Sequence, residues 1–99
     1  GEIYGNLFIA EIASHTAEPL EVRFELVAER GETLVMPNNP IRIEEARLLR
    51  QPFTLQFPKD AIRSGRGTAK IRIHVRPTSS ADSALVEIQD KEVTLVGPF

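Results

Sequence analysis

The most regular pattern in the chain is Ala69-Lys70-Ile71-Arg72-Ile73-His74-Val75-Arg76, in which apolar residues alternate with basic residues or histidine. Successive side chains of a β-strand point to opposite faces, so the apolar residues share one face and the basic residues share the other. Such alternation is typical of an antiparallel strand that is covered on one side only. The stretch therefore predicts a strand of an antiparallel sheet.

Weaker forms of this pattern recur along the chain, separated by proline, glycine and asparagine. They fall at residues 7–12, 21–26, 33–36, 41–44, 48–57 and 84–96. The residues expected to form the shared core are Phe8, Ile12, Val22, Phe24, Leu26, Phe53, Leu55, Phe57, Ile71, Ile73 and Val75. About seven short strands without a long helical pattern predict an all-β, immunoglobulin-like (fibronectin-type) antiparallel β-sandwich, with residues 1–99 as a single domain.

Three local features carry expectations of their own. Pro52 cannot donate a ladder hydrogen bond, which predicts an edge position or a bulge at the start of that strand. The apolar positions Ile88 and Val93 differ in phase, which predicts a bulge or break at residues 89–91. Residues 59–68 contain Ser64-Gly65 and show no period, so we expect a loop with one turn around residues 61–62.

Composition limits the possible functions. The chain has 99 residues, 41% of them hydrophobic and 26% charged, with a formal net charge of -2, as in an ordinary globular domain. Its longest apolar run, Leu7 to Ala10, is far shorter than a membrane-spanning helix. The absence of cysteine excludes disulfides, thiolate metal sites and a cysteine nucleophile. Because the chain starts at Gly1 and soon turns apolar, we expect a fragment of a larger protein.

Candidate catalytic and metal-binding residues are few. His15 and His74 are the only histidines, and neither has neighbouring ligands at the spacing of a metal site, so both are expected to be solvated. Met36 ends an apolar run and is expected in the core. No nucleophile elbow or phosphate-binding loop is present. We therefore expect no catalysis, no cofactor and no copper site within this chain.

One charge pattern exceeds the background, and we call its six basic residues the basic strip: Lys59, Arg63, Arg66, Lys70, Arg72 and Arg76. Asp60 is the only acid in this stretch, and no aromatic residue lies between Phe57 and Phe99, which argues against a nucleic-acid surface. Two interpretations stay open. The strip protects a sheet edge from pairing with another chain, or it contacts an anionic membrane surface or an acidic partner.

The order of strands and turns resembles the C-terminal immunoglobulin-like domain of the FixG/CcoG family of cytochrome oxidase accessory proteins. The resemblance spans nearly the whole chain and rests on Asn6-Leu7-Phe8 with Ile12, Thr16 and Pro19, on Val22-x-Phe24-x-Leu26, on Phe53-x-Leu55-x-Phe57-Pro58 and on Gly97-Pro98.

This resemblance implies a parent protein with inner-membrane helices and a ferredoxin-type 4Fe-4S segment that serves copper handling and assembly of a cbb-type oxidase. The present chain would be its non-catalytic accessory domain on the periplasmic side, with the iron–sulfur clusters in the missing part. Implied partners are the remainder of its own membrane-embedded chain, oxidase assembly components or an anionic membrane surface. The alternative is a free-standing extracytoplasmic binding module, adhesin-like or carbohydrate-binding, although such modules usually present exposed aromatic platforms and this chain has a single tyrosine.

Overall fold

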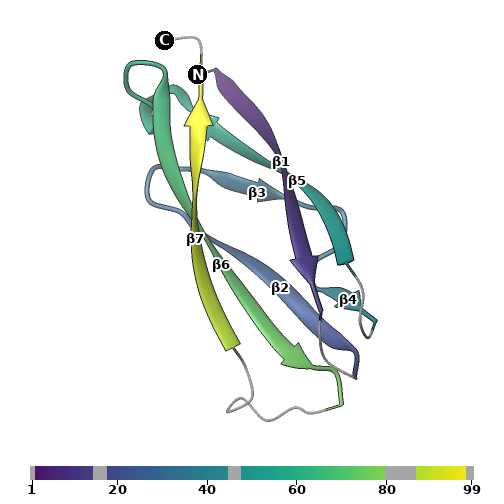
Figure 1. Ribbon diagram of the computed structural model, residues 1–99. Helices are drawn as coiled ribbons and strands as arrows, with labels where there is room; N and C mark the ends of the chain where they lie inside the picture. Colours follow the sequence, from purple (N-terminus) through teal and green to yellow (C-terminus); the bar gives the residue numbers. More distant parts are fainter. Residues whose placement is uncertain (1, 15–17, 45–47, 80–86, 98–99) are drawn as a thin grey trace.

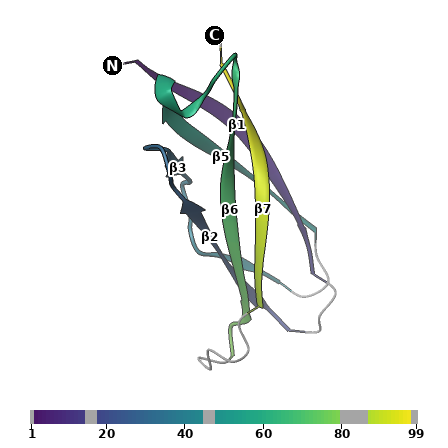
Figure 2. The same ribbon diagram turned by 90° about the vertical axis from the view of Figure 1, so that its left-hand side faces the viewer.

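The computed structural model describes residues 2–14, 18–44, 48–79 and 87–97. Within these residues the strands form two antiparallel sheets that pack face to face (Figures 1 and 2). One sheet has the order β1-β5-β3 and the other has the order β4-β2-β6-β7. The elements are β1 (Ile3–Ala13), β2 (Leu20–Val27), β3 (Thr33–Val35), β4 (Ile41–Ile43), β5 (Leu48–Pro58), the 3-10 helix η1 (Lys59–Ala61), β6 (Arg66–Pro77) and β7 (Glu87–Val96). The predicted antiparallel β-sandwich is therefore confirmed.

The core lies between the two sheets and is built around aromatic contacts. The ring of Phe53 on β5 lies 5.4 Å from that of Phe8 on β1 and 5.8 Å from that of Phe24 on β2, so it joins the two sheets. The buried apolar residues are Val22, Phe24, Ile41, Ile43, Phe53, Leu55, Phe57, Ala61, Ala69, Ile71 and Leu95. The other expected core residues, Phe8, Ile12, Leu26, Ile73 and Val75, are only partly buried against this cluster.

Strand β7 corrects one expectation. It pairs with β6 in one continuous register, from Val75 opposite Glu87 to Arg66 opposite Val96, so no bulge interrupts residues 89–91. The phase conflict is resolved differently, because Ile88 points to the outer face and stays 55% exposed while Val93 and Leu95 face the core. Leaving one isoleucine in water keeps the whole ladder of backbone hydrogen bonds intact.

Strand β5 also runs without a bulge, since its register with β1 is constant from Ile3 opposite Pro58 to Ala13 opposite Leu48. Pro52 lies opposite Ile9 in this ladder. On the other side of β5, the pairing with β3 reaches only from Gln56 to Thr54. Pro52 thus occupies a part of β5 that has a strand partner on one side only, which fits the predicted edge position.

Strand β6 is an interior strand. It lies between β2 and β7, and it begins at Arg66 rather than at Ala69 as the alternation predicted. A strand with partners on both sides has no free edge to protect. The interpretation of the basic strip as edge protection is therefore wrong for the residues of β6.

The start of β1 and the end of β7 lie at the same end of the sandwich as η1 (Figure 1). Ile3 pairs with Pro58, which directly precedes η1, and the Gly97 N–H donates a hydrogen bond of 3.0 Å to the Gly65 carbonyl oxygen. This end of the molecule is called the terminal end below. Among the described residues, no helix is long and apolar enough to cross a lipid bilayer.

Candidate functional site

The structure divides the basic strip into two groups, and in the group along the middle and end of β6 two arginines, Arg72 and Arg76, are paired with carboxylates. Arg72 contacts Asp90 of β7 through two nitrogen–oxygen distances of 2.9 and 3.3 Å. The pair raises the pKa of the Arg72 guanidinium and lowers the pKa of the Asp90 carboxyl group. Arg76 contacts Glu21 of β2 at 3.2 and 3.1 Å. Because these arginines already have carboxylate partners, they offer little charge to another molecule.

The predictions for the two histidines and for Met36 have different outcomes. His74 faces outward, but its side chain is only 18% exposed and its Nε2 lies 3.3 Å from a Glu25 carboxylate oxygen, so it is not simply solvated. Met36 packs against the core cluster as predicted. His15 lies outside the described residues. Within the described part of the chain, no three His, Asp or Glu side chains come together as a possible metal site.

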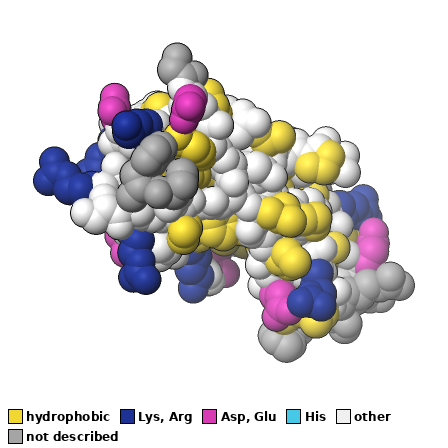
Figure 3. Space-filling model, turned by 90° about the horizontal axis from the view of Figure 1, so that it is seen from above, with side chains coloured by type: hydrophobic (Ala, Val, Ile, Leu, Met, Phe, Trp, Pro, Cys, Tyr) yellow, Lys and Arg dark blue, Asp and Glu magenta, His cyan; other side chains and the backbone are white. Residues whose placement is uncertain are grey.

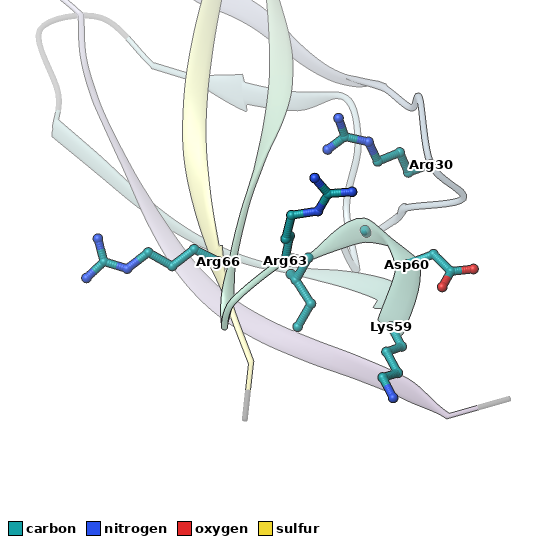
Figure 4. A pocket seen from close by; sticks show the side chains of 7 residues that line it. Arg30, Lys59, Asp60, Arg63 and Arg66 are labelled. Carbon is teal, nitrogen blue, oxygen red and sulfur yellow. The ribbon is translucent and has the colours of Figure 1, made fainter. Parts of the chain in front are cut away.

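The other group of the basic strip gathers at the terminal end. Lys59, Arg63 and Arg66 line a pocket of about 520 Å³ together with Arg30, Asp60 and the apolar Ala61 and Ile62 (Figure 4). We call this the cationic pocket. It draws residues from η1, from the start of β6 and from the turn between β2 and β3. The structure therefore brings together three residues of the strip and separates them from Lys70, Arg72 and Arg76.

The turn between η1 and β6 places Arg63 and Arg66. Ser64 and Gly65 have positive φ angles of 54° and 80°, which is the geometry of a two-residue type I′ turn. Arg63 and Arg66 exchange backbone hydrogen bonds of 2.7 and 3.1 Å across it. Gly67 then passes so close to η1 that a Cβ atom there would lie 2.3 Å from the Ala61 carbonyl oxygen. The close approach of β6 to η1, which shapes the pocket, therefore requires a glycine at position 67.

Arg30 belongs to the pocket although it lies far from the strip in the sequence. Its position is set by Glu32, whose buried carboxylate accepts backbone hydrogen bonds from Arg30 at 2.8 Å and from Glu29 at 3.1 Å. Gly31 between them has a φ of 80°, which glycine adopts readily. In the sequence this turn is visible as Glu29-Arg30-Gly31-Glu32. Only the packing of the two sheets shows that the turn lies beside η1.

The charges of the cationic pocket are not balanced internally. Among the described residues, no carboxylate lies within ion-pair distance of Arg30, Arg63 or Arg66, in contrast to the arginines of the outer face of β6. In Figure 4 the guanidinium groups of Arg30 and Arg63 extend into the same space beside η1, whereas Arg66 extends away from it. Seen from the terminal end, several Lys and Arg side chains gather on one side, next to a band of hydrophobic side chains (Figure 3).

Guanidinium groups bind planar and tetrahedral oxyanions through paired hydrogen bonds, and carboxylates and phosphates fit them best. The arrangement of Arg30 and Arg63 is suited to holding such an anion. Asp60 points to the outside of the same pocket in Figure 4 and reduces its positive charge.

Comparison of the chain with models of known families, with curated proteins and with solved structures gave no match.

Proposed function

We propose that this chain is a non-catalytic interaction domain that contacts an anionic partner through its cationic pocket. The observation that carries this proposal is the uneven distribution of unpaired positive charge. On the outer face of β6, Arg72 and Arg76 are paired with Asp90 and Glu21, while the guanidinium groups of Arg30 and Arg63 in the pocket have no carboxylate within ion-pair distance among the described residues. Charge that is not paired within the molecule is available for pairing outside it.

We further propose that the domain is the immunoglobulin-like sandwich of a FixG/CcoG-type membrane protein involved in cbb-type oxidase assembly and copper handling. The order of motifs along the chain and the β-sandwich architecture support this identification. In such a parent, in the inner membrane, the domain would lie on the periplasmic side. The terminal end would then face the bilayer, because β1 starts there, and the cationic pocket would lie beside anionic headgroups or an acidic face of an oxidase assembly component.

A direct test measures binding of the chain to vesicles that contain phosphatidylglycerol. The double variant R30Q/R63Q should bind about thirtyfold more weakly, since each basic residue near an anionic surface contributes about 1 kcal/mol. The control is R72Q/R76Q, which changes the net charge equally but removes arginines that already have partners. We expect less than about a threefold loss for this control. Equal losses in the two variants, or no binding of the unaltered chain, would contradict the proposal.

The parent protein is tested separately. A hydrophobic stretch of about 20 residues upstream of Gly1, preceded by clusters of cysteines, supports the accessory-domain proposal, whereas a secretion signal directly before Gly1 supports a free-standing binding module. In the full-length protein, replacing Arg30, Arg63 and Arg66 by glutamate should lower the amount of assembled oxidase while the domain stays folded. Unchanged assembly in this variant would remove the cationic pocket from the function.

A further inference from the structure

The sandwich is open along one side, between the edge strands β1 and β7. A groove of about 250 Å³ lies there, with walls formed by residues 8–12 of β1 and by Lys91 and Val93 of β7. Its floor is apolar and consists of Phe24, Phe53, Ile71 and Ile73. Figure 1 shows β1 and β7 close together near the terminal end and separating farther along. The partial burial of Phe8, Ile12 and Ile73 follows from this opening.

The free edge of β7 can accept another strand. Near the terminal end the side chain of Asn6 bridges to it, donating to the Val96 carbonyl oxygen at 3.0 Å and accepting from the Val96 N–H at 2.7 Å. The backbone groups of Val96 therefore point away from β6. Because backbone direction alternates with a period of two, those of Thr94, Glu92 and Asp90 point the same way, toward the open side. No strand of the described residues pairs with them.

The side chains of β7 define what such a strand should carry. Val93 faces the groove, so an added strand would place apolar residues inward against Phe8 and Phe53. On the outer face Asp90 is already paired with Arg72, but Glu92 forms no ion pair among the described residues, so a basic residue suits the outward position beside Glu92. The paired edge of β7 already shows this preference, since β6 places Lys70 opposite Glu92 and Arg72 opposite Asp90.

We propose that this groove binds an extended segment of a partner protein that alternates apolar and basic residues and adds to the free edge of β7 as a further strand. Main-chain hydrogen bonds to Thr94, Glu92 and Asp90 would provide affinity, and the apolar floor and the Glu92 carboxylate would select the side-chain pattern. The inference is independent of the cationic pocket, which lies at the terminal end and recognises a different chemistry.

The probe is a fluorescent peptide with the sequence of residues 69–76, which carries the pattern that β7 accepts on its other edge. We expect saturable binding to the unaltered chain, followed by fluorescence anisotropy. The same peptide with glutamate in place of its lysine and arginines should bind at least about tenfold more weakly. In hydrogen exchange, the amides of Glu92 and Thr94 should become protected when the first peptide is bound.

A matched pair of variants separates the groove from the rest of β1. Ala10 lines the groove and Ala13 is exposed on the outer face of the same strand, so Ala10→Lys should lower peptide affinity about tenfold and Ala13→Lys less than about twofold. Circular dichroism verifies that both variants fold. Equal binding of the two peptides, equal losses in the two variants or unprotected Glu92 and Thr94 amides would overturn the proposal. So would a peptide-free homodimer that protects these amides.

Discussion

The outer faces of the two sheets differ in their chemistry. The outer face of β2, β6 and β7 is charged and largely self-neutralised, with the ion pairs Arg72–Asp90 and Arg76–Glu21 and the contact between His74 and Glu25. The outer face of β1, β5 and β3 is mainly aliphatic and carries the ion pair between Glu11 and Arg50. Its exposed large side chains are Ile3, Leu7, Ile9, Val35 and Leu48, which are between 44% and 70% exposed.

The difference shows that alternation is used in two ways in one domain. In the four-stranded sheet, apolar residues point inward and charged residues outward, so each strand is strongly directed to one orientation. In β1 both faces are apolar, and orientation comes from which side chains fit the core, as Phe8 does beside Phe53. Outward charged residues on the four-stranded sheet form ion pairs across neighbouring strands. Outward aliphatic residues on the three-stranded sheet contribute little to folding, because they stay in water.

The largest expected effect comes from comparing two leucines. Leu55 of β5 is completely buried and Leu7 of β1 is 70% exposed. Leu55→Ala should lower the free energy of unfolding by about 2 to 5 kcal/mol, because it removes buried methyl groups and leaves a cavity. Leu7→Ala should change it by no more than about 0.5 kcal/mol. Urea unfolding of both variants measures the difference, and a large effect of Leu7→Ala would mean that another surface covers this face.

The second prediction concerns how the charged sheet completes its β2 edge. The Asn39 side chain accepts a hydrogen bond from the Phe24 N–H at 2.9 Å and donates one to the Phe24 carbonyl oxygen at 2.8 Å, where β4 no longer reaches. Asn39→Ala should cost about 1 to 3 kcal/mol, because both backbone groups lose their partner. Asn38→Ala is the control, because Asn38 is exposed like Asn39 but the hydrogen bonds to the Phe24 backbone come from Asn39. Equal stabilities of the two variants in urea unfolding would show that water replaces the amide.

Many of the strands and core residues could be predicted from the sequence, and the features that could not be predicted have physical causes. Strands with strict alternation, such as β2 and β6, were predicted with the correct inward residues, because hydrophobic burial of one face determines their orientation. The burial of Ile41 and Leu95 and the pairing of β6 on both sides depend on contacts between distant segments, which periodicity does not contain. For the same reason the sequence suggested Lys59, Arg63 and Arg66 as a contact surface but not Arg30, which joins them only through the β2–β3 turn.

A smaller effect is expected when ion pairs on the two faces are compared. The Arg76–Glu21 side chains are 34% and 30% exposed, whereas those of Arg50–Glu11 are 66% and 58% exposed. Double-mutant cycles with glutamine should give a coupling energy of at most about 1 kcal/mol for the first pair and near zero for the second. A stronger coupling for Arg50–Glu11 would contradict the view that the aliphatic face gains little from its charges.

The smallest effect appears only as a dependence on pH. Hydrogen bonding to Arg72 lowers the pKa of Asp90 in the folded chain, below the value of about 3.9 that an aspartate has when unfolded. The folded state then binds the proton less readily than the unfolded state, so this pair stabilises the fold above that value and loses its contribution as the pH falls through the lower, folded pKa. Urea unfolding between neutral pH and pH values well below 3.9 should therefore show Asp90→Asn less stable than the unaltered chain at neutral pH and equally stable in acid. Glu87→Gln removes a carboxylate from the same strand without touching Arg72 and should follow the unaltered chain throughout. The contrary outcome is that the free energy of unfolding of Asp90→Asn runs parallel to that of the unaltered chain into acid. The ion pairs on the charged face would then be solvated side chains that add no stability. The two outer faces would differ in polarity but not in their contribution to stability.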